Sequence, residues 1–162
     1  MSKWEIKVDK SGSGVSGSLF KVQVVGTIDE DTDFRPYDLA GASTVEMNLD
    51  GVKSINSCGI REWIKWITTA GSATIQYHSC PKVIVDQINM VQGFLPAQGQ
   101  VVSFYVPYYS EESDEEKAVL YNNGKEFNDL GLLQKPTVKD GQGKDMDMDV
   151  IESKYFKFLK KG

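Results

Sequence analysis

Apolar and polar residues alternate along several short segments in the first two thirds of the chain. In WEIKVDK, the apolar residues Trp4, Ile6 and Val8 are separated by charged ones, which is the period-two pattern of a half-buried strand. The same pattern predicts strands in LFKVQVVGTID, STVEMNLDGV, SATIQYHS and QVVSFYVPYY. Two segments predict connections: the glycine- and serine-rich residues 10–18, and DEDTDFRPYDLAG, which has room for a short helix.

Two other segments have the period of a helix. In SINSCGIREWIKWI, four apolar residues recur at helical spacing and are expected to form one buried face: Ile60, Trp63, Ile64 and Ile67. Trp66 falls at the margin of that face, so we expect it to be partly exposed. The segment CPKVIVDQINMVQGF predicts a second helix, with Pro81 suited to its first position.

Strands and helices therefore alternate, which favours an α/β fold with a mixed sheet packed against helices. After Tyr108 the composition becomes acidic and only patchily apolar. We expect two parts, a main domain at residues 1–108 and a small α+β extension at residues 109–162. The extension ends in DVIESKYFKFLKK, a predicted docking helix whose apolar residues share one face: Ile151, Tyr155, Phe158 and Leu159.

Charge and composition exclude several classes of protein. The net charge of −5 argues against nucleic-acid binding, which needs a basic surface to displace counterions. The first residues, MSKWEIKVDK, lack the apolar core of a signal peptide, and no apolar run approaches the length of a membrane span. We therefore expect a cytoplasmic protein that does not insert into a membrane. Two cysteines, Cys58 and Cys80, are too few for a disulfide framework and are expected to be free thiols.

The turn from Asn56 to Gly59 joins a predicted strand to the strongest predicted helix. Asn56 and Ser57 are suited to capping the helix, and this structural role alone would explain the turn. A helix N-terminus also gathers free N–H groups, so it attracts a phosphate or the carboxylate of a partner. It stabilises a thiolate too, which makes Cys58, with Cys80, a candidate redox pair. No Cys-His-Asp set or glycine-rich phosphate loop is present, so we expect no enzymatic activity and no cofactor.

The same turn, in this place in the order of strands and helices, resembles the motif of STAS domains. That fold is shared by sulphate transporters and anti-sigma factor antagonists, and in it Asp-Ser-Ser/Thr-Gly-Leu opens the main helix. Here the corresponding residues are Asn56, Ser57, Cys58, Gly59 and Ile60. In the phospho-regulated antagonists the residue before the glycine receives the phosphate, and Cys58 occupies that position.

The resemblance implies a bacterial signalling protein that binds a protein partner through the start of the main helix. Such a partner would be an anti-sigma factor, a kinase-like protein or a transporter subunit. The candidate partner-binding residues are Asn56, Ser57, Cys58, Gly59, Arg61 and Trp66. Two alternatives remain: a structural subunit docked on a transporter ATPase without switching, and a thiol-based redox sensor using Cys58 and Cys80.

The extension resembles a small zinc ribbon that has lost its ligands. Proteins with a STAS-like domain can carry a ribbon with two Cys-x-x-Cys turns, and here Ser110 and Ser113 have that spacing in YSEESDEE. The segment PTVKDG stands where a second such turn would be. Zinc requires thiolate or imidazole ligands, and the extension contains no cysteine or histidine, so no bound metal is expected.

Overall fold

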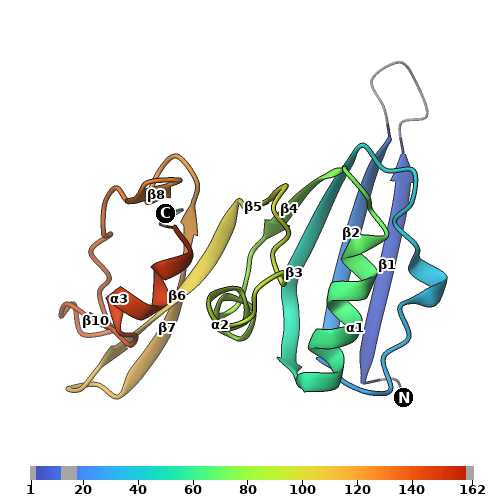
Figure 1. The fold of residues 1–162 in the computed structure, drawn as a ribbon. Helices are drawn as coiled ribbons and strands as arrows, with labels where there is room; N and C mark the ends of the chain where they lie inside the picture. Colours follow the sequence, from blue (N-terminus) through green and yellow to red (C-terminus); the bar gives the residue numbers. More distant parts are fainter. Residues whose placement is uncertain (1–2, 12–17, 160–162) are drawn as a thin grey trace.

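A five-stranded sheet and a smaller C-terminal sheet lie side by side in the computed structural model, which describes residues 3–11 and 18–159 (Figure 1). Most of the predicted connection at residues 10–18 falls outside the described residues. In spatial order, the strands of the larger sheet are β1 Trp4–Ser11, β2 Leu19–Ile28, β3 Thr44–Ile55, β4 Thr74–His78 and β5 Gly99–Val101. β1 runs antiparallel to β2, and the other neighbours are parallel.

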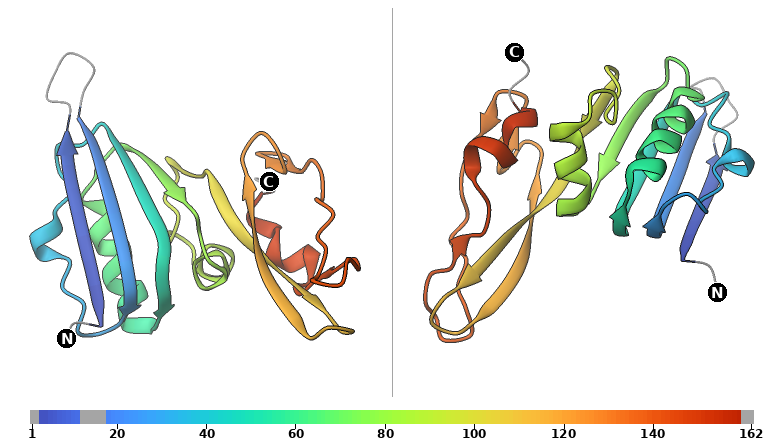
Figure 2. Two further views of the ribbon diagram at one scale, coloured as in Figure 1. Left: turned by 180° about the vertical axis from the view of Figure 1, so that it is seen from behind. Right: turned by 60° about the horizontal axis from the view of Figure 1, so that its bottom comes forward.

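Helix α1 (Ser57–Thr68) lies against one face of the larger sheet, and the view from behind places the strands in front of it (Figures 1 and 2). α1 covers the face to which the apolar residues of the predicted alternating pattern point. In β2, the buried Phe20 and Val22 alternate with the exposed Lys21 and Gln23. The order of elements predicted for this part is confirmed, and with it the α/β class.

Trp63 stands at the centre of the main core and is fully buried. Its ring stacks on Phe94 with 5.2 Å between ring centroids. Its indole Nε1–H donates to the Tyr77 hydroxyl at 3.1 Å, and that hydroxyl donates to the carbonyl of Phe94 at 2.6 Å. Each buried polar atom of this group therefore has a partner, which removes the cost of burying it.

The predicted final strand QVVSFYVPYY is wrong as a single strand. It divides into β5, which ends at Val101 in the first sheet, and β6 (Ser103–Ser110), which begins the second sheet. The two pieces have different neighbours: β5 runs parallel to β4, whereas β6 pairs antiparallel with β7 (Glu115–Asn122). Cys80 joins the two sheets: its N–H donates to Ser103 and its carbonyl accepts from Tyr105.

The second sheet has the order β10–β6–β7, with β10 at Asp147–Met148. A separate two-stranded ribbon follows β7 in the chain and consists of β8 (Phe127–Asn128) and β9 (Gly131–Leu132). The remaining elements are the 3-10 turn η1 (Arg35–Tyr37), helices α2 (Lys82–Met90) and α3 (Glu152–Tyr155), and the 3-10 turn η2 (Lys157–Leu159).

The C-terminal helix docks on β6 and α2 but is shorter than its sequence pattern predicts. Tyr155 and Leu159 are buried, and the Tyr155 ring lies 6.2 Å from that of Phe104. Ile151 is 62% exposed, so its expected place on the buried face is wrong. The reason is that α3 is a single turn and Ile151 is the residue that precedes it, so no helical face extends back to that position.

Candidate functional site

Asn56 caps α1 and also fixes the loop beside it. Its side-chain Oδ1 accepts a hydrogen bond from the backbone N–H of Gly59 at 2.9 Å, which satisfies one of the free donors of the helix start. Its Nδ2 donates to a carboxylate oxygen of Glu30 at 2.8 Å. An aspartate would cap equally well but could not donate, so the amide suits a position that faces a carboxylate.

Gly59 lets the first turn of α1 approach the end of β2 closely. A Cβ at this position would lie 2.5 Å from the carbonyl oxygen of Ile28, a distance that side-chain carbons do not occupy. The backbone N–H of Asn56 donates to the same oxygen at 3.1 Å. The chain therefore needs glycine here because backbone lies directly against backbone.

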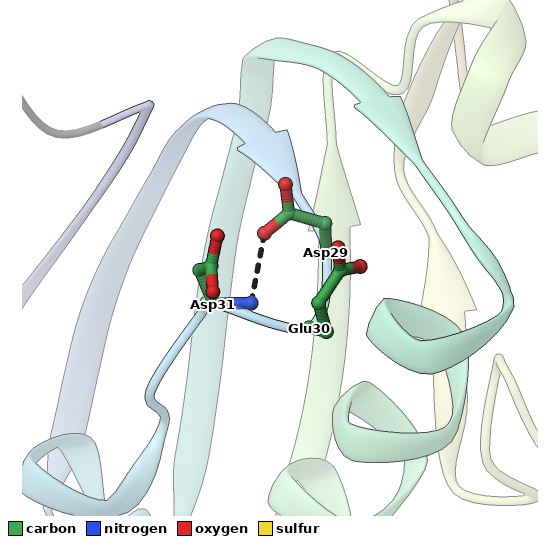
Figure 3. A group of neighbouring side chains, drawn as sticks. All are labelled: Asp29, Glu30 and Asp31. Atoms are coloured by element: carbon green, nitrogen blue, oxygen red, sulfur yellow. Dashed lines mark hydrogen bonds between the residues drawn. The ribbon is translucent and has the colours of Figure 1, made fainter.

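Three consecutive carboxylates, Asp29, Glu30 and Asp31, follow β2 at this edge of the sheet (Figure 3). Their ligand oxygens lie within 4.8 Å of one another, but each carboxylate already has a partner. Asp29 accepts from the N–H of Asp31 at 3.0 Å, and Lys3 lies 3.7 Å from Asp29 and 3.9 Å from Asp31. The hydrogen bond from Asn56 lowers the pKa of Glu30 below its ordinary value. The group is therefore explained by contacts within the chain.

We call the outward side chains at this edge the α1 entry surface: Glu30, Asn56, Ser57, Cys58 and Arg61. Ser57 and Arg61 are exposed, Cys58 is half-buried, and among the described residues Arg61 has no carboxylate partner. The sequence pattern identified all of these except Glu30. It could have been found too, because carboxyl ends of neighbouring parallel strands meet at one edge of a sheet.

Trp66 does not belong to this surface, and the expectation that it is partly exposed is wrong. It is 3% exposed, its ring stacks on Phe34 at 4.7 Å, and its indole N–H donates to the carbonyl of Tyr37 at 2.8 Å. The connection between β2 and β3 folds across this side of α1 and extends the apolar face. Gly59 is likewise buried, so it shapes the turn rather than contacting a partner.

The two thiols have different surroundings. Both are free, but Cys80 is completely buried, and burial raises the pKa of its thiol well above the ordinary value. Cys58 is half-buried in the first turn of α1. A thiol that ionises reluctantly and has no contact with solvent is a poor redox centre, so the Cys80 half of the redox hypothesis loses its physical basis.

The spacing of Ser110 and Ser113 does bring two side chains together in the extension. Both hydroxyls donate to one carboxylate oxygen of Asp140, at 2.8 and 3.0 Å. The other oxygen accepts the backbone N–H groups of Gln142 and Lys144, at 2.8 and 3.0 Å. We call this arrangement the Asp140 clasp, and it ties the β6–β7 turn to the turn that precedes β10.

Four hydrogen bonds to its oxygens hold the pKa of Asp140 far below its ordinary value, the largest contribution coming from the backbone N–H of Lys144. The polar atoms at this place therefore satisfy one another within the chain. Asp140 lies in the segment in which a second ligand turn was expected, but the pattern did not identify the residue itself.

Comparisons with protein-family models, with curated proteins and with solved structures found no match for this chain. Within residues 3–11 and 18–159, no helix has both the length and the apolar content that crossing a bilayer requires.

Proposed function

We propose that the chain is a STAS-like signalling protein without enzymatic activity that binds a protein partner through the α1 entry surface. One observation carries the proposal: the start of α1 is held in place from two sides while Ser57 and Arg61 remain exposed. The Asn56 cap and its bond to Glu30 hold one side, and the close approach of Gly59 to Ile28 holds the other.

A surface of this kind favours binding of a partner because its backbone loses little conformational freedom when the complex forms. Association loses affinity when loops and side chains must be immobilised, and here the backbone is already fixed. The Arg61 guanidinium, which has no carboxylate partner in the part of the chain that the structure describes, can form a bidentate contact with a carboxylate, and the helix N-terminus attracts negative charge. A partner with an acidic contact residue fits this chemistry.

Likeness to STAS domains is supported by the order of elements, by the antiparallel β1 at the edge of an otherwise parallel sheet, and by the turn at the start of α1. The phosphate position of the antagonists corresponds to Cys58. Negative charge there would repel an acidic partner, so it should switch binding off in the way that phosphorylation does in the antagonists.

Photocrosslinking in the source organism tests the proposal first. A benzophenone amino acid placed at Ser57 should capture one protein, whereas the same group at Ser72 should not. Ser72 is also exposed but lies in the turn at the opposite end of α1. The captured protein is then purified for titration.

Calorimetric titration compares Cys58→Asp with Ser72→Asp, which adds the same charge elsewhere. We expect Cys58→Asp to raise Kd about tenfold or more, which corresponds to ~1.4 kcal/mol, and Ser72→Asp to change it less than about twofold. Circular dichroism checks that both variants fold. Equal affinity of the two folded variants would reject the α1 entry surface and favour a structural subunit with its contacts elsewhere.

A further inference from the structure

A groove of about 600 Å³ runs between α2 and the C-terminal segment around α3. Asn89 and Met90 line it from α2, and Val150 and Ile151 line it from the segment after β10. In the views of Figure 2, α2 and α3 lie next to each other, at the junction of the two sheets. The groove is distant in sequence from the α1 entry surface and shares no residue with it.

The groove exposes two large apolar side chains to solvent. Met90 is 70% exposed and Ile151 is 62% exposed, and both line the same groove. Exposed apolar side chains gathered in one place, unlike single ones, mark interaction sites. Two other large apolar side chains, Leu130 and Leu133, are similarly exposed in and beside the β8–β9 ribbon, but they do not line this groove. Met90 and Ile151 therefore form a pair of anchoring positions on opposite walls.

The charges around the groove are not balanced. Lys82 is neutralised by Asp86 at 2.8 Å, one turn along α2. Lys154 and Lys157 have no carboxylate partner among the described residues, and Asp149 is the single unpaired carboxylate of the lining. A surplus of positive charge thus accompanies the apolar pair in a chain whose net charge is −5.

The base of the groove is fixed by hydrogen bonds between its two walls. The Asn89 side chain donates to the carbonyl of Tyr155 at 2.9 Å and accepts from the N–H of Phe158 at 2.9 Å. A further bond, from the Tyr155 hydroxyl to the carbonyl of Tyr105 at 2.5 Å, holds the C-terminal wall on β6. Since the walls are joined before anything binds, the groove exists as a preformed receptor.

We propose that this groove binds an acidic amphipathic helical segment of a partner protein. Apolar residues one turn apart would contact Met90 and Ile151, and flanking carboxylates would face Lys154 and Lys157. Methionine suits such a site because its unbranched, polarisable side chain adapts to different apolar partners. The groove is thus a second docking surface of the chain, independent of the proposed α1 entry surface.

A pair of labelled peptides tests the proposal by fluorescence anisotropy. Both have leucines at positions i, i+3, i+4 and i+7; one carries glutamates at the flanking positions and the other lysines. The acidic peptide should bind saturably and about tenfold or more tightly than the basic one. Lys154→Glu/Lys157→Glu should invert this preference.

Matched serine variants locate the binding. Met90→Ser/Ile151→Ser should raise the Kd of the acidic peptide about tenfold. Leu130→Ser/Leu133→Ser, a similarly exposed pair outside the groove, should change this Kd less than about twofold. All four side chains are exposed, so the variants should fold. Absence of saturable binding, equal losses in both pairs, or equal binding of both peptides would overturn the proposal. Self-association of the chain that Met90→Ser/Ile151→Ser abolishes would also overturn it, by assigning the groove to a second copy.

Discussion

The larger and the smaller sheet of this molecule are each stabilised by a different kind of contact. In the larger one, α1 seals an apolar core whose central residue, Trp63, has no contact with solvent. The smaller sheet has an aromatic cluster around Phe104 at one end, while its far end is secured by the Asp140 clasp. Apolar burial depends weakly on pH, whereas a carboxylate clasp requires an ionised group. The two sheets should therefore fail under different conditions.

Removing a tryptophan from α1 should have the largest effect on the stability of the larger sheet and its core. Trp63→Ala and Trp66→Ala should each lower the free energy of unfolding by about 3–5 kcal/mol, since both rings are buried and both indole N–H groups are bonded. Urea unfolding followed by circular dichroism measures this, with the exposed Lys65→Ala as control. A loss for Trp66→Ala no larger than for Lys65→Ala would contradict its buried position.

Gly59→Ala should destabilise the protein by about 1–3 kcal/mol because the new methyl group meets the carbonyl of Ile28. The sign of the effect is informative. In an unconstrained helix, alanine is favoured over glycine by about 1 kcal/mol. A Gly59→Ala variant more stable than the wild type would therefore show that α1 does not closely approach the Ile28 carbonyl. The same denaturant titration applies, and Ser57→Ala, exposed in the same turn, is the control.

Asn56→Ala should cost about 1 kcal/mol through loss of the helix cap. Asn56→Asp should keep the cap but place a carboxylate against Glu30, so the pKa of Glu30 should rise relative to that in the wild type. Carbon-detected NMR titration of the Glu30 carboxyl group measures the shift. An unchanged pKa in Asn56→Asp would mean that the two side chains are not in contact in solution.

Acidification should release the clasp without unfolding the larger sheet. Because the folded-state pKa of Asp140 is depressed, its contribution to stability is complete above the unfolded-state value of about 3.9. It is then lost as the pH falls further, through the lower folded-state value. The amide proton resonances of Gln142 and Lys144 should move in that range, while those of α1 stay in place.

Asp140→Asn supplies the comparison for this titration. The amide has one acceptor oxygen instead of two, so those resonances should already be displaced at neutral pH and should respond less to acid. Asp129→Asn, at an exposed position of the β8–β9 turn, should titrate as the wild type does. Identical acid responses of Asp140→Asn and wild type would assign the transition to another group.

Local periodicity predicted much of the first part. The period of α1 identified Trp63 as buried, and the polar turn before it identified Asn56 as the cap. Trp66 was placed wrongly because the groups that cover it, Phe34 and Tyr37, belong to a connection with no periodic pattern. A helical pattern shows its own faces but not which loop will return to cover one.

Polar contacts between distant residues were less accessible to prediction. The spacing of Ser110 and Ser113 marked a place where side chains converge, yet their common acceptor, Asp140, lies about thirty positions further on. Hydrogen bonds across such separations leave no repeat in the sequence. Ile151 was misplaced for a related reason, because a run of apolar residues near a chain end does not reveal that the helix is one turn long.

Because of where its tryptophans lie, intrinsic fluorescence can follow the larger sheet separately from the smaller one. All three tryptophans, Trp4, Trp63 and Trp66, belong to the larger sheet or to α1, whereas five of the seven tyrosines lie between residues 105 and 155. Indole emission, excited selectively at long wavelength, therefore reports the larger sheet alone. Release of the second sheet would be silent in that signal and visible in tyrosine absorbance, so the two parts can be observed separately in one unlabelled sample.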